Sequence, residues 1–496
     1  MKRREFCASL AGGLGAARLL AQQPVPGHPR ELRFAPLPFT PPRAADYRHR
    51  LSNGALAFLV EDHDFPLINV GVIIRAGEYL EPREKTGLAS LTGSQIRSGG
   101  ARAKPPAVFD EEAAFLAAQI SSNIGPLQGS AGLNCLSKDI DAGLALFFEM
   151  LRAPGFAEAR LKLAKSQILQ SLERRNDSAE AIEAREFQRL IRGEQHFSTR
   201  QITKATLESI TRPDLADFHS RYYYPANFIF AVSGDFETAR MLEKLEKAMA
   251  GWENRTAPIP PVPKPAFAPK PGIYLVEKAD VNQGRVRMGH LGVMMTNPDH
   301  IAISIMNSIL GGGGFTSRIT SRVRSDEGLA YQAGSSFQHG NFYEGAFQVV
   351  FQSKSPTVAE AVAIIKEEIE RIRRGGVTPE ELEVEKNFAI ESFPRRFATA
   401  AAKAMQFASD DYLKIPEDYW QTYRDRVRAL TPADIQRVAQ KYLQPDNLVI
   451  LAVGNTEAIL KGNPDRPQFA LAKLAPTIHR IPLPDPLTMV YPSAIP

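Results

Sequence analysis

Two apolar runs, 228–232 and 448–453, have the same surroundings in the chain. Each is short and bounded by turn residues, which predicts a buried strand. A capped helix and an x-Pro-x-Asn break precede each run, and a glycine follows it. Segments 211–234 and 431–454 match at a constant offset of 220 residues, which indicates a duplicated domain. The identical pairs are Thr211/Thr431, Asp214/Asp434, Tyr222/Tyr442, Pro225/Pro445, Asn227/Asn447 and Gly234/Gly454.

A proline-rich stretch separates the two copies. Residues 257–265 read Ala-Pro-Ile-Pro-Pro-Val-Pro-Lys-Pro, and this proline density excludes helix and favours an extended, semi-rigid linker. We therefore expect a linker at 252–271 between an N-terminal half at 46–251 and a C-terminal half at 272–460. A Pro-rich tail, 461–496, follows the second half.

Within each half, strand patterns and helix patterns are mixed. Residues 56–60 and 68–74 predict two strands that pair around the turn 61–64. A helical apolar period covers 358–374, and Thr378 opens the next helix with a capping box. This combination predicts an α+β fold, with an antiparallel sheet in each half and helices on one face of the sheet.

The chain has 496 residues, 44% of them hydrophobic and 23% charged, as in ordinary globular proteins. No apolar run reaches the roughly 20 residues that a transmembrane helix needs, so no transmembrane segment is expected. Arg3 and Arg4 precede a short apolar run that ends near Ala21, which resembles a twin-arginine export signal. We expect residues 1–21 to be this signal and the protein to be exported to the periplasm. The alternative is a basic N-terminus without a signal function.

The basic net charge belongs largely to the expected signal. Residues 1–21 contain four basic residues and one acidic residue, so their removal lowers the formal net charge from +5 to +2. No nucleic-acid partner is therefore expected. Cys135 is then the only cysteine left, so no internal disulfide can form.

Residues 87–94 read Gly-Leu-Ala-Ser-Leu-Thr-Gly-Ser. The segment resembles the zinc-binding helix of the insulinase/pitrilysin family, the inverted zinc metallopeptidases, whose motif is G-L-A-H-x-x-E-H. In that family the two His bind zinc and the Glu activates the attacking water. The resemblance places Ser90, Gly93 and Ser94 at these three positions, and Ser171 at the position of the third ligand, a Glu.

The residues at these four positions do not suit zinc. Hydroxyl groups are poor zinc ligands, because such a site needs imidazole, thiolate or carboxylate. None of the nine His lies within four residues of another, so no helix can present the usual His pair. We expect no metal cofactor in this chain, although a site built from distant His stays possible.

The resemblance to the insulinase/pitrilysin family extends over residues 46–460. It implies two homologous α+β halves that enclose a chamber, and a dimer of two such chains. In the family's peptidases, an Arg and a Tyr with the spacing of Arg324 and Tyr331 lie across the chamber from the zinc. A guanidinium and a phenol can donate hydrogen bonds to the scissile carbonyl and its developing oxyanion. The alternative is a surface Arg and a strand Tyr that packs on the sheet.

A run of four glycines precedes this pair. It is not a phosphate-binding loop, because no Gly-Lys-Ser/Thr follows it. We expect a helix to end at residues 309–310 and the glycines to form its exit turn. The family's processing peptidases use a glycine-rich loop on the non-zinc subunit to guide substrate, so the run is also a possible substrate loop. It comprises Gly311, Gly312, Gly313 and Gly314.

Three hypotheses follow. In the first, this chain is the non-zinc subunit of a heterodimeric peptidase, inactive alone, whose homologous partner supplies zinc and the base while a peptide substrate adds to a sheet edge. In the second, it is a catalytically inert peptide-binding or scaffold pseudopeptidase, like the core subunits of the respiratory cytochrome b-c complex. The third is an active peptidase with a relocated zinc site.

Overall fold

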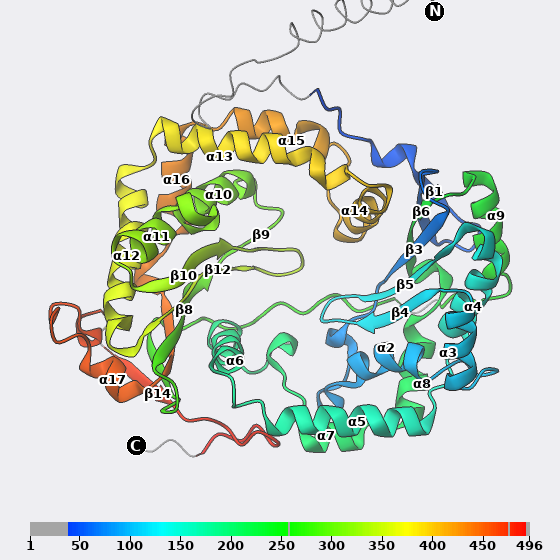
Figure 1. Ribbon diagram of the computed structural model, residues 1–496, viewed down its shortest axis with the longest axis horizontal. Helices are drawn as coiled ribbons and strands as arrows, with labels where there is room; N and C mark the ends of the chain where they lie inside the picture. The colour runs from blue at the N-terminus through cyan, green and yellow to red at the C-terminus, as the bar shows by residue number, and fades with distance from the viewer. Residues whose placement is uncertain (1–37, 256–257, 475–476, 493–496) are drawn as a thin grey trace, which may run out of the picture. The chain divides into compact units, whose positions relative to one another are not determined.

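Twelve strands form two six-stranded sheets in the computed structural model, which describes residues 38–255, 258–474 and 477–492 (Figure 1). The predicted export signal lies outside the described residues. The first sheet has the order β1 (Arg48–Arg50), β2 (Leu56–Glu61), β6 (Phe228–Gly234), β3 (Leu67–Ile74), β5 (Gly129–Leu136), β4 (Gln119–Ile124). The second has the order β10 (Ala330–Phe337), β12 (Ala346–Lys354), β8 (Gln283–Leu291), β13 (Val449–Gly454), β7 (Gly272–Glu277), β14 (Ile478–Ile481). A short parallel pair joins β9 (Val293–Met294) to β11 (His339–Gly340).

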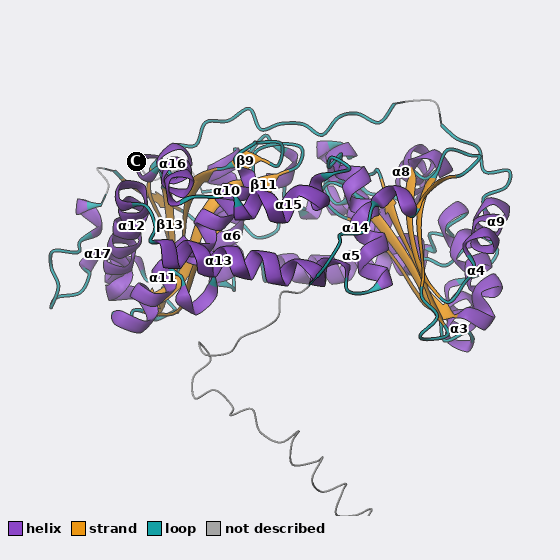
Figure 2. Ribbon diagram, turned by 90° about the horizontal axis from the view of Figure 1, so that it is seen from above, coloured by secondary structure: helices purple, strands orange, loops and turns teal. Residues whose placement is uncertain are grey.

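Helices cover both sheets, which confirms the predicted α+β fold (Figure 2). The helices before the linker are α2 (Leu88–Ser98), α3 (Pro106–Phe115), α4 (Ile140–Arg152), α5 (Glu158–Glu173), α6 (Ala179–Arg192), α7 (Lys204–Ser209), α8 (Arg212–Tyr222) and α9 (Thr238–Ala248). Those after it are α10 (His300–Asn307), α11 (Arg318–Thr320), α12 (Val358–Gly375), α13 (Pro379–Ser392), α14 (Ala400–Leu413), α15 (Tyr419–Arg428), α16 (Pro432–Tyr442) and α17 (Thr456–Lys461).

The prediction that β2 and β3 pair with each other is wrong. Strand β6 lies between them, parallel to β2 and antiparallel to β3. Every residue of β6 is buried, so the strand gains most in the middle of the sheet, where both of its edges are hydrogen-bonded. The second sheet is likewise mixed, because β7 pairs in parallel with both β13 and β14. The sequence analysis did not anticipate β14, which comes from the predicted tail.

The internal repeat is present in the structure. Helix α8 leads into β6, and α16 leads into β13, each through a short turn that contains the Pro and the Asn. Each helix begins with a capping box, in which the carboxylate of Asp214 or Asp434 accepts the N–H of the threonine three residues before it, at 2.8 and 3.0 Å. The same local signals therefore produce the same helix-to-strand unit twice.

Each half contributes one helix to the sheet of the other. Helix α6 packs on β13 and β8 of the second sheet, and α14 packs on β6 and β2 of the first. Alternate residues of β13 face α6, and the residues between them face the core that α12 and α16 cover. The middle of each sheet is therefore buried on both faces, not on one as predicted, which explains the unbroken apolar runs of β6 and β13.

A buried ion pair fixes α6 on the second sheet. Glu183 has no exposed side-chain surface, and its carboxylate accepts hydrogen bonds from Arg285 and Arg287 of β8. One turn earlier, Glu180 bonds Arg285 at 3.1 Å but is 72% exposed. Two guanidinium groups thus share one desolvated carboxylate at the point where the two halves meet.

Removing that carboxylate should destabilise the protein. We expect Glu183→Gln to lower the free energy of unfolding by about 3 kcal/mol, because two buried arginines lose their counter-charge. The matched change Glu180→Gln should cost well under about 1 kcal/mol, since an exposed ion pair contributes little. Urea denaturation followed by circular dichroism measures both. Equal effects would mean that Glu183 does not hold α6 in place.

Candidate functional site

Helix α2 contains three of the four positions at which the family's zinc motif is expected. Ser90 is half-buried, and its hydroxyl donates to the main-chain oxygen of Gly87 at 3.3 Å. Ser94 is exposed and donates to the oxygen of Leu91 at 3.0 Å. Both hydroxyls are thus engaged with their own helix, which is the ordinary behaviour of a helical serine.

Gly93 lies where α2 crosses strand β4. A Cβ atom built on Gly93 would be 2.3 Å from the main-chain nitrogen of Ile124 and 2.7 Å from the carbonyl carbon of Asn123. These are backbone atoms of a hydrogen-bonded strand and cannot move aside as a flexible side chain could. The space that a glutamate side chain would need at this position is therefore filled by β4.

The fourth position, Ser171, is exposed near the end of α5. Helix α5 contacts α2, so the fold brings the four positions onto two adjoining helices. The donors do not fit zinc, because two serines bond their own helix carbonyls and Gly93 offers no side chain. In the part of the chain that the structure describes, no three His, Cys, Asp or Glu are grouped so that they could hold a metal ion.

A buried carboxylate caps the start of α2. Glu81 is 6% exposed and accepts the N–H groups of Gly87 at 3.0 Å and Ala89 at 2.8 Å. Gly87 has a φ of 102°, a conformation that favours glycine at this cap. Burial raises the pKa of Glu81 from 4.5 to about 7, although the two N–H groups favour the charged form. The sequence analysis did not single out Glu81.

Because the pKa of Glu81 is higher in the folded than in the unfolded protein, its protonation stabilises the fold. This contribution is fully present below about pH 4.5 and is lost as the pH rises through about 7. We expect the free energy of unfolding to fall over this window in the parent relative to Glu81→Gln, which cannot ionise. Parallel urea titrations at several pH values measure the difference. A difference that stays constant with pH would contradict the assignment.

Arg324 and Tyr331 lie together, as their expected pairing requires. The guanidinium carbon of Arg324 is 4.9 Å from the centre of the Tyr331 ring and 4.3 Å from that of Phe315. Tyr331 is 77% exposed and Phe315 70% exposed, while Arg324 is half-buried between them. The cation is thus stacked between two solvent-facing rings, which limits its motion and leaves its N–H groups free to bind a ligand.

The sequence analysis missed Phe315. Its position directly after the four glycines was the available signal, because a large aromatic beside such a run is brought to the surface by the turn. The tyrosine of this cluster is on β10, at the edge of the second sheet, where the register shifts between Ala330 and Ala333.

The prediction that a helix ends at residues 309–310 is wrong. The helix continues as a π-helical turn, Ser308–Gly312, and the chain turns only at Gly314, where φ is 71°. A Cβ on Gly311 would be 2.7 Å from the main-chain nitrogen of Ser335 in β10. At least one glycine of the run therefore serves close packing of this turn against the sheet. The role of the run as a substrate loop stays a prediction.

The fold and the site together define a peptidase-like chain without zinc ligands. The sequence profile of the family described as "Peptidase M16 inactive domain" matches residues 209–388. Three known proteins have similar sequences. The non-peptidase homolog YmxG of Helicobacter pylori is 23% identical over 402 residues, which cover 80% of this chain and 90% of that protein. The zinc protease PqqE of the same organism is 26% identical over 248 residues (48% and 54%). Subunit 1 of the Bos taurus mitochondrial cytochrome b-c1 complex is 22% identical over 268 residues (53% and 54%).

Solved structures share the fold. The peptidase M16 inactive domain from Pseudomonas fluorescens superposes with a TM-score of 0.74 at 24% identity, over 82% of this chain and 97% of that one. The periplasmic protease PqqL from Escherichia coli superposes with a TM-score of 0.70 at 12% identity, over 88% of this chain and 49% of that one. The chain belongs to the insulinase/pitrilysin family, and it lacks the H-x-x-E-H motif of that family's peptidases.

None of the helices that the structure describes has the length and the apolar character to cross a membrane.

Proposed function

We propose that this chain is the zinc-lacking subunit of a heterodimeric insulinase-like metallopeptidase. A homologous partner with an intact H-x-x-E-H motif supplies the zinc and the base. This chain supplies Arg324 and Tyr331, which bind the scissile carbonyl of a peptide and the oxyanion that develops from it. The chain alone hydrolyses no peptide.

The observation that carries the proposal is the contrast between the two halves. In the first half, β4 occupies the place of the catalytic glutamate and serines replace the ligands. In the second half, the Arg and the Tyr are both present, adjacent and open to solvent. Such a division favours a composite site, in which each chain keeps only the part that it uses.

Two relatives from one organism support a pair. Helicobacter pylori has both a non-peptidase homolog, YmxG, and a zinc protease, PqqE, and both are similar to this chain. An organism that keeps one member with zinc chemistry and one without it has the components of a heterodimer. We extend this arrangement to the present chain as part of the proposal.

A sheet edge beside the Arg and Tyr suits a peptide. Strand β10 pairs with β12 on one side only, so its other edge has free N–H and C=O groups among the described strands. Tyr331 belongs to this strand, and Gln332 beside it is also exposed. We propose that substrate adds to the sheet here through main-chain hydrogen bonds, which tolerate many side chains.

Co-purification from the native host tests the proposal. We expect this chain to be isolated with a homologue that carries H-x-x-E-H, and metal analysis of the separated subunits should find zinc in the partner only. Peptide hydrolysis should require both chains. Isolation of this chain alone, or stoichiometric zinc in it, would contradict the proposal.

A second candidate is a catalytically inert peptide-binding or scaffold protein. It is favoured by the similarity to subunit 1 of a cytochrome b-c1 complex. The same purification separates the two candidates, because a scaffold would be isolated in a complex without peptidase activity.

We also propose that the protein acts in the periplasm. Support comes from the twin-arginine pattern of residues 1–21 and from the fold shared with a periplasmic protease. The proposed boundaries of the remaining parts are 46–251, 252–271, 272–460 and 461–496.

A further inference from the structure

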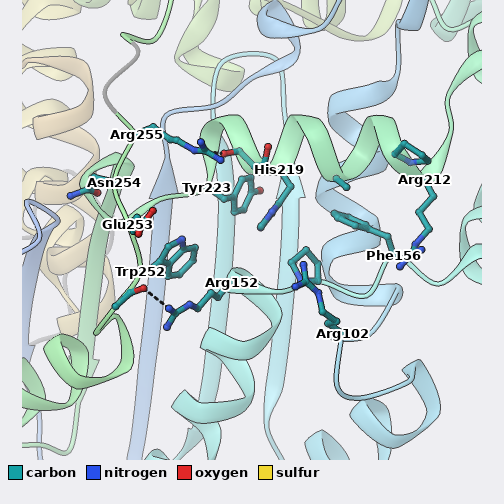
Figure 3. A pocket seen from close by; sticks show the side chains of 15 residues that line it. Arg102, Arg152, Phe156, Arg212, His219, Tyr223, Trp252, Glu253, Asn254 and Arg255 are labelled. Atoms are coloured by element: carbon teal, nitrogen blue, oxygen red, sulfur yellow. Dashed lines mark hydrogen bonds between the residues drawn. The ribbon is translucent and has the colours of Figure 1, made fainter.

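The largest pocket of the described residues lies apart from the Ser, Arg and Tyr positions discussed above. It has a volume of about 570 Å³. Its walls come from the first turns of α8, the end of α4, the loop after α2 and the segment that follows α9 (Figure 3). A pocket of this size can hold a small organic molecule.

Four arginines line this pocket: Arg102, Arg152, Arg212 and Arg255. None of them lies within 4 Å of a carboxylate in the part of the chain that the structure describes. Three are oriented by main-chain oxygens instead. Arg152 donates to two carbonyls at 3.0 and 2.6 Å, and Arg212 and Arg255 donate to one each at 3.0 Å. Carbonyls fix the direction of a guanidinium without neutralising its charge, and most of its N–H groups remain unused.

One carboxylate, that of the exposed Glu253, lines the same pocket. It does not balance four cations. The lining therefore carries an excess of positive charge that a bound anion would neutralise.

Aromatic rings form the floor between the arginines (Figure 3). Phe156, His219 and Tyr223 are buried, and Trp252 is half-buried. Burial, together with the charge of Arg102, lowers the pKa of His219 to about 4, so the imidazole is neutral at pH 7. The floor thus offers ring surface, and the charge is confined to the arginines around it.

We propose that this pocket binds a small organic phosphate that carries an aromatic ring, of which a nucleoside diphosphate is the simplest probe. Guanidinium groups bind phosphate oxygens through paired N–H donors, and four of them here converge on one space. The ring of the ligand packs on the half-exposed Trp252, as a flat apolar group does on an indole. The site is independent of the proposed peptidase role, and its test needs no partner chain.

Tryptophan fluorescence and calorimetry on the purified chain test the proposal. The chain has two tryptophans, and Trp420 is buried with its indole N–H bonded to Asp410 at 2.6 Å. We expect adenosine diphosphate to quench the emission of Trp252, and pyrophosphate to bind more weakly because it has no ring. Trp252→Phe should remove the fluorescence change and keep the heat of binding.

Two variants examine the arginines. Arg102 is exposed and makes no side-chain contact with a described residue, so Arg102→Ala should leave the fold unchanged. Arg102→Ala and Arg212→Ala should each weaken binding of adenosine diphosphate about tenfold. Arg395→Ala, an exposed arginine after α13, is the matched control and should bind as the parent does.

Two outcomes would overturn the assignment. One is no binding of either phosphate probe at millimolar concentration. The other is binding that the arginine variants and the control change equally, which would indicate non-specific attraction to a basic surface. Binding of an oligoglutamate peptide in place of both phosphate probes would also contradict it, since the site would then take an acidic protein segment.

Discussion

Gly93→Ala is expected to destabilise this protein by about 3 kcal/mol, although glycine-to-alanine changes usually stabilise a helix. At an exposed helical position the change gains about 1 kcal/mol, because alanine loses less conformational entropy. At Gly93 the added methyl carbon would be 2.3 Å from the backbone of β4, so α2 and the sheet must separate. Urea denaturation of the parent and the variant measures the difference.

Ser94→Ala is the control, because Ser94 is exposed one residue further along the same helix. It should change the free energy of unfolding by no more than about 0.5 kcal/mol. Gly93→Glu should destabilise more than Gly93→Ala, so adding it to Ser90→His, Ser94→His and Ser171→Glu should not create a peptidase. If Gly93→Ala is as stable as the parent, the helix can move from β4 and the site could be rebuilt.

Arg324→Ala is expected to lower the turnover of the reconstituted heterodimer about 100-fold, which is typical for the loss of one donor to a developing oxyanion. Tyr331→Phe removes only a hydroxyl and should lower kcat with little change in KM, because that bond forms mainly in the transition state. Steady-state kinetics with a fluorogenic peptide and an excess of each variant measures both effects.

Two exposed phenylalanines provide the controls for this pair. Phe315→Ala should lower turnover by less than Arg324→Ala does, because it frees the guanidinium without removing it. Phe388→Ala changes a ring of similar exposure, 65% against 70%, on α13 and should have no effect. Full activity of both Arg324→Ala and Tyr331→Phe would remove the pair from the mechanism and favour the scaffold hypothesis.

Local signals in the sequence predicted local structure well. The capping pairs at Thr211 and Thr431, and the apolar runs after them, define helix-to-strand units that the structure contains twice. The order of strands was not predictable in the same way. Nothing within 56–74 shows that β6, which follows more than 150 residues later, is inserted between its two strands.

The candidate site shows the same division. Residue types alone were enough to exclude zinc at Ser90, Ser94 and Ser171. The reason that Gly93 is a glycine depends on the approach of β4, which no local pattern reports. Phe315 became part of the cluster only when the fold placed it on the far side of Arg324.

The exchange of α6 and α14 has a consequence for how this chain can be divided. Each sheet would lose the cover of one face if the polypeptide were expressed as two separate pieces, and the bared apolar strands would favour aggregation. A cut within residues 258–271, where no helix or strand is present, removes no such cover. The two fragments should then stay associated, as an interlocked pair joined by packing alone.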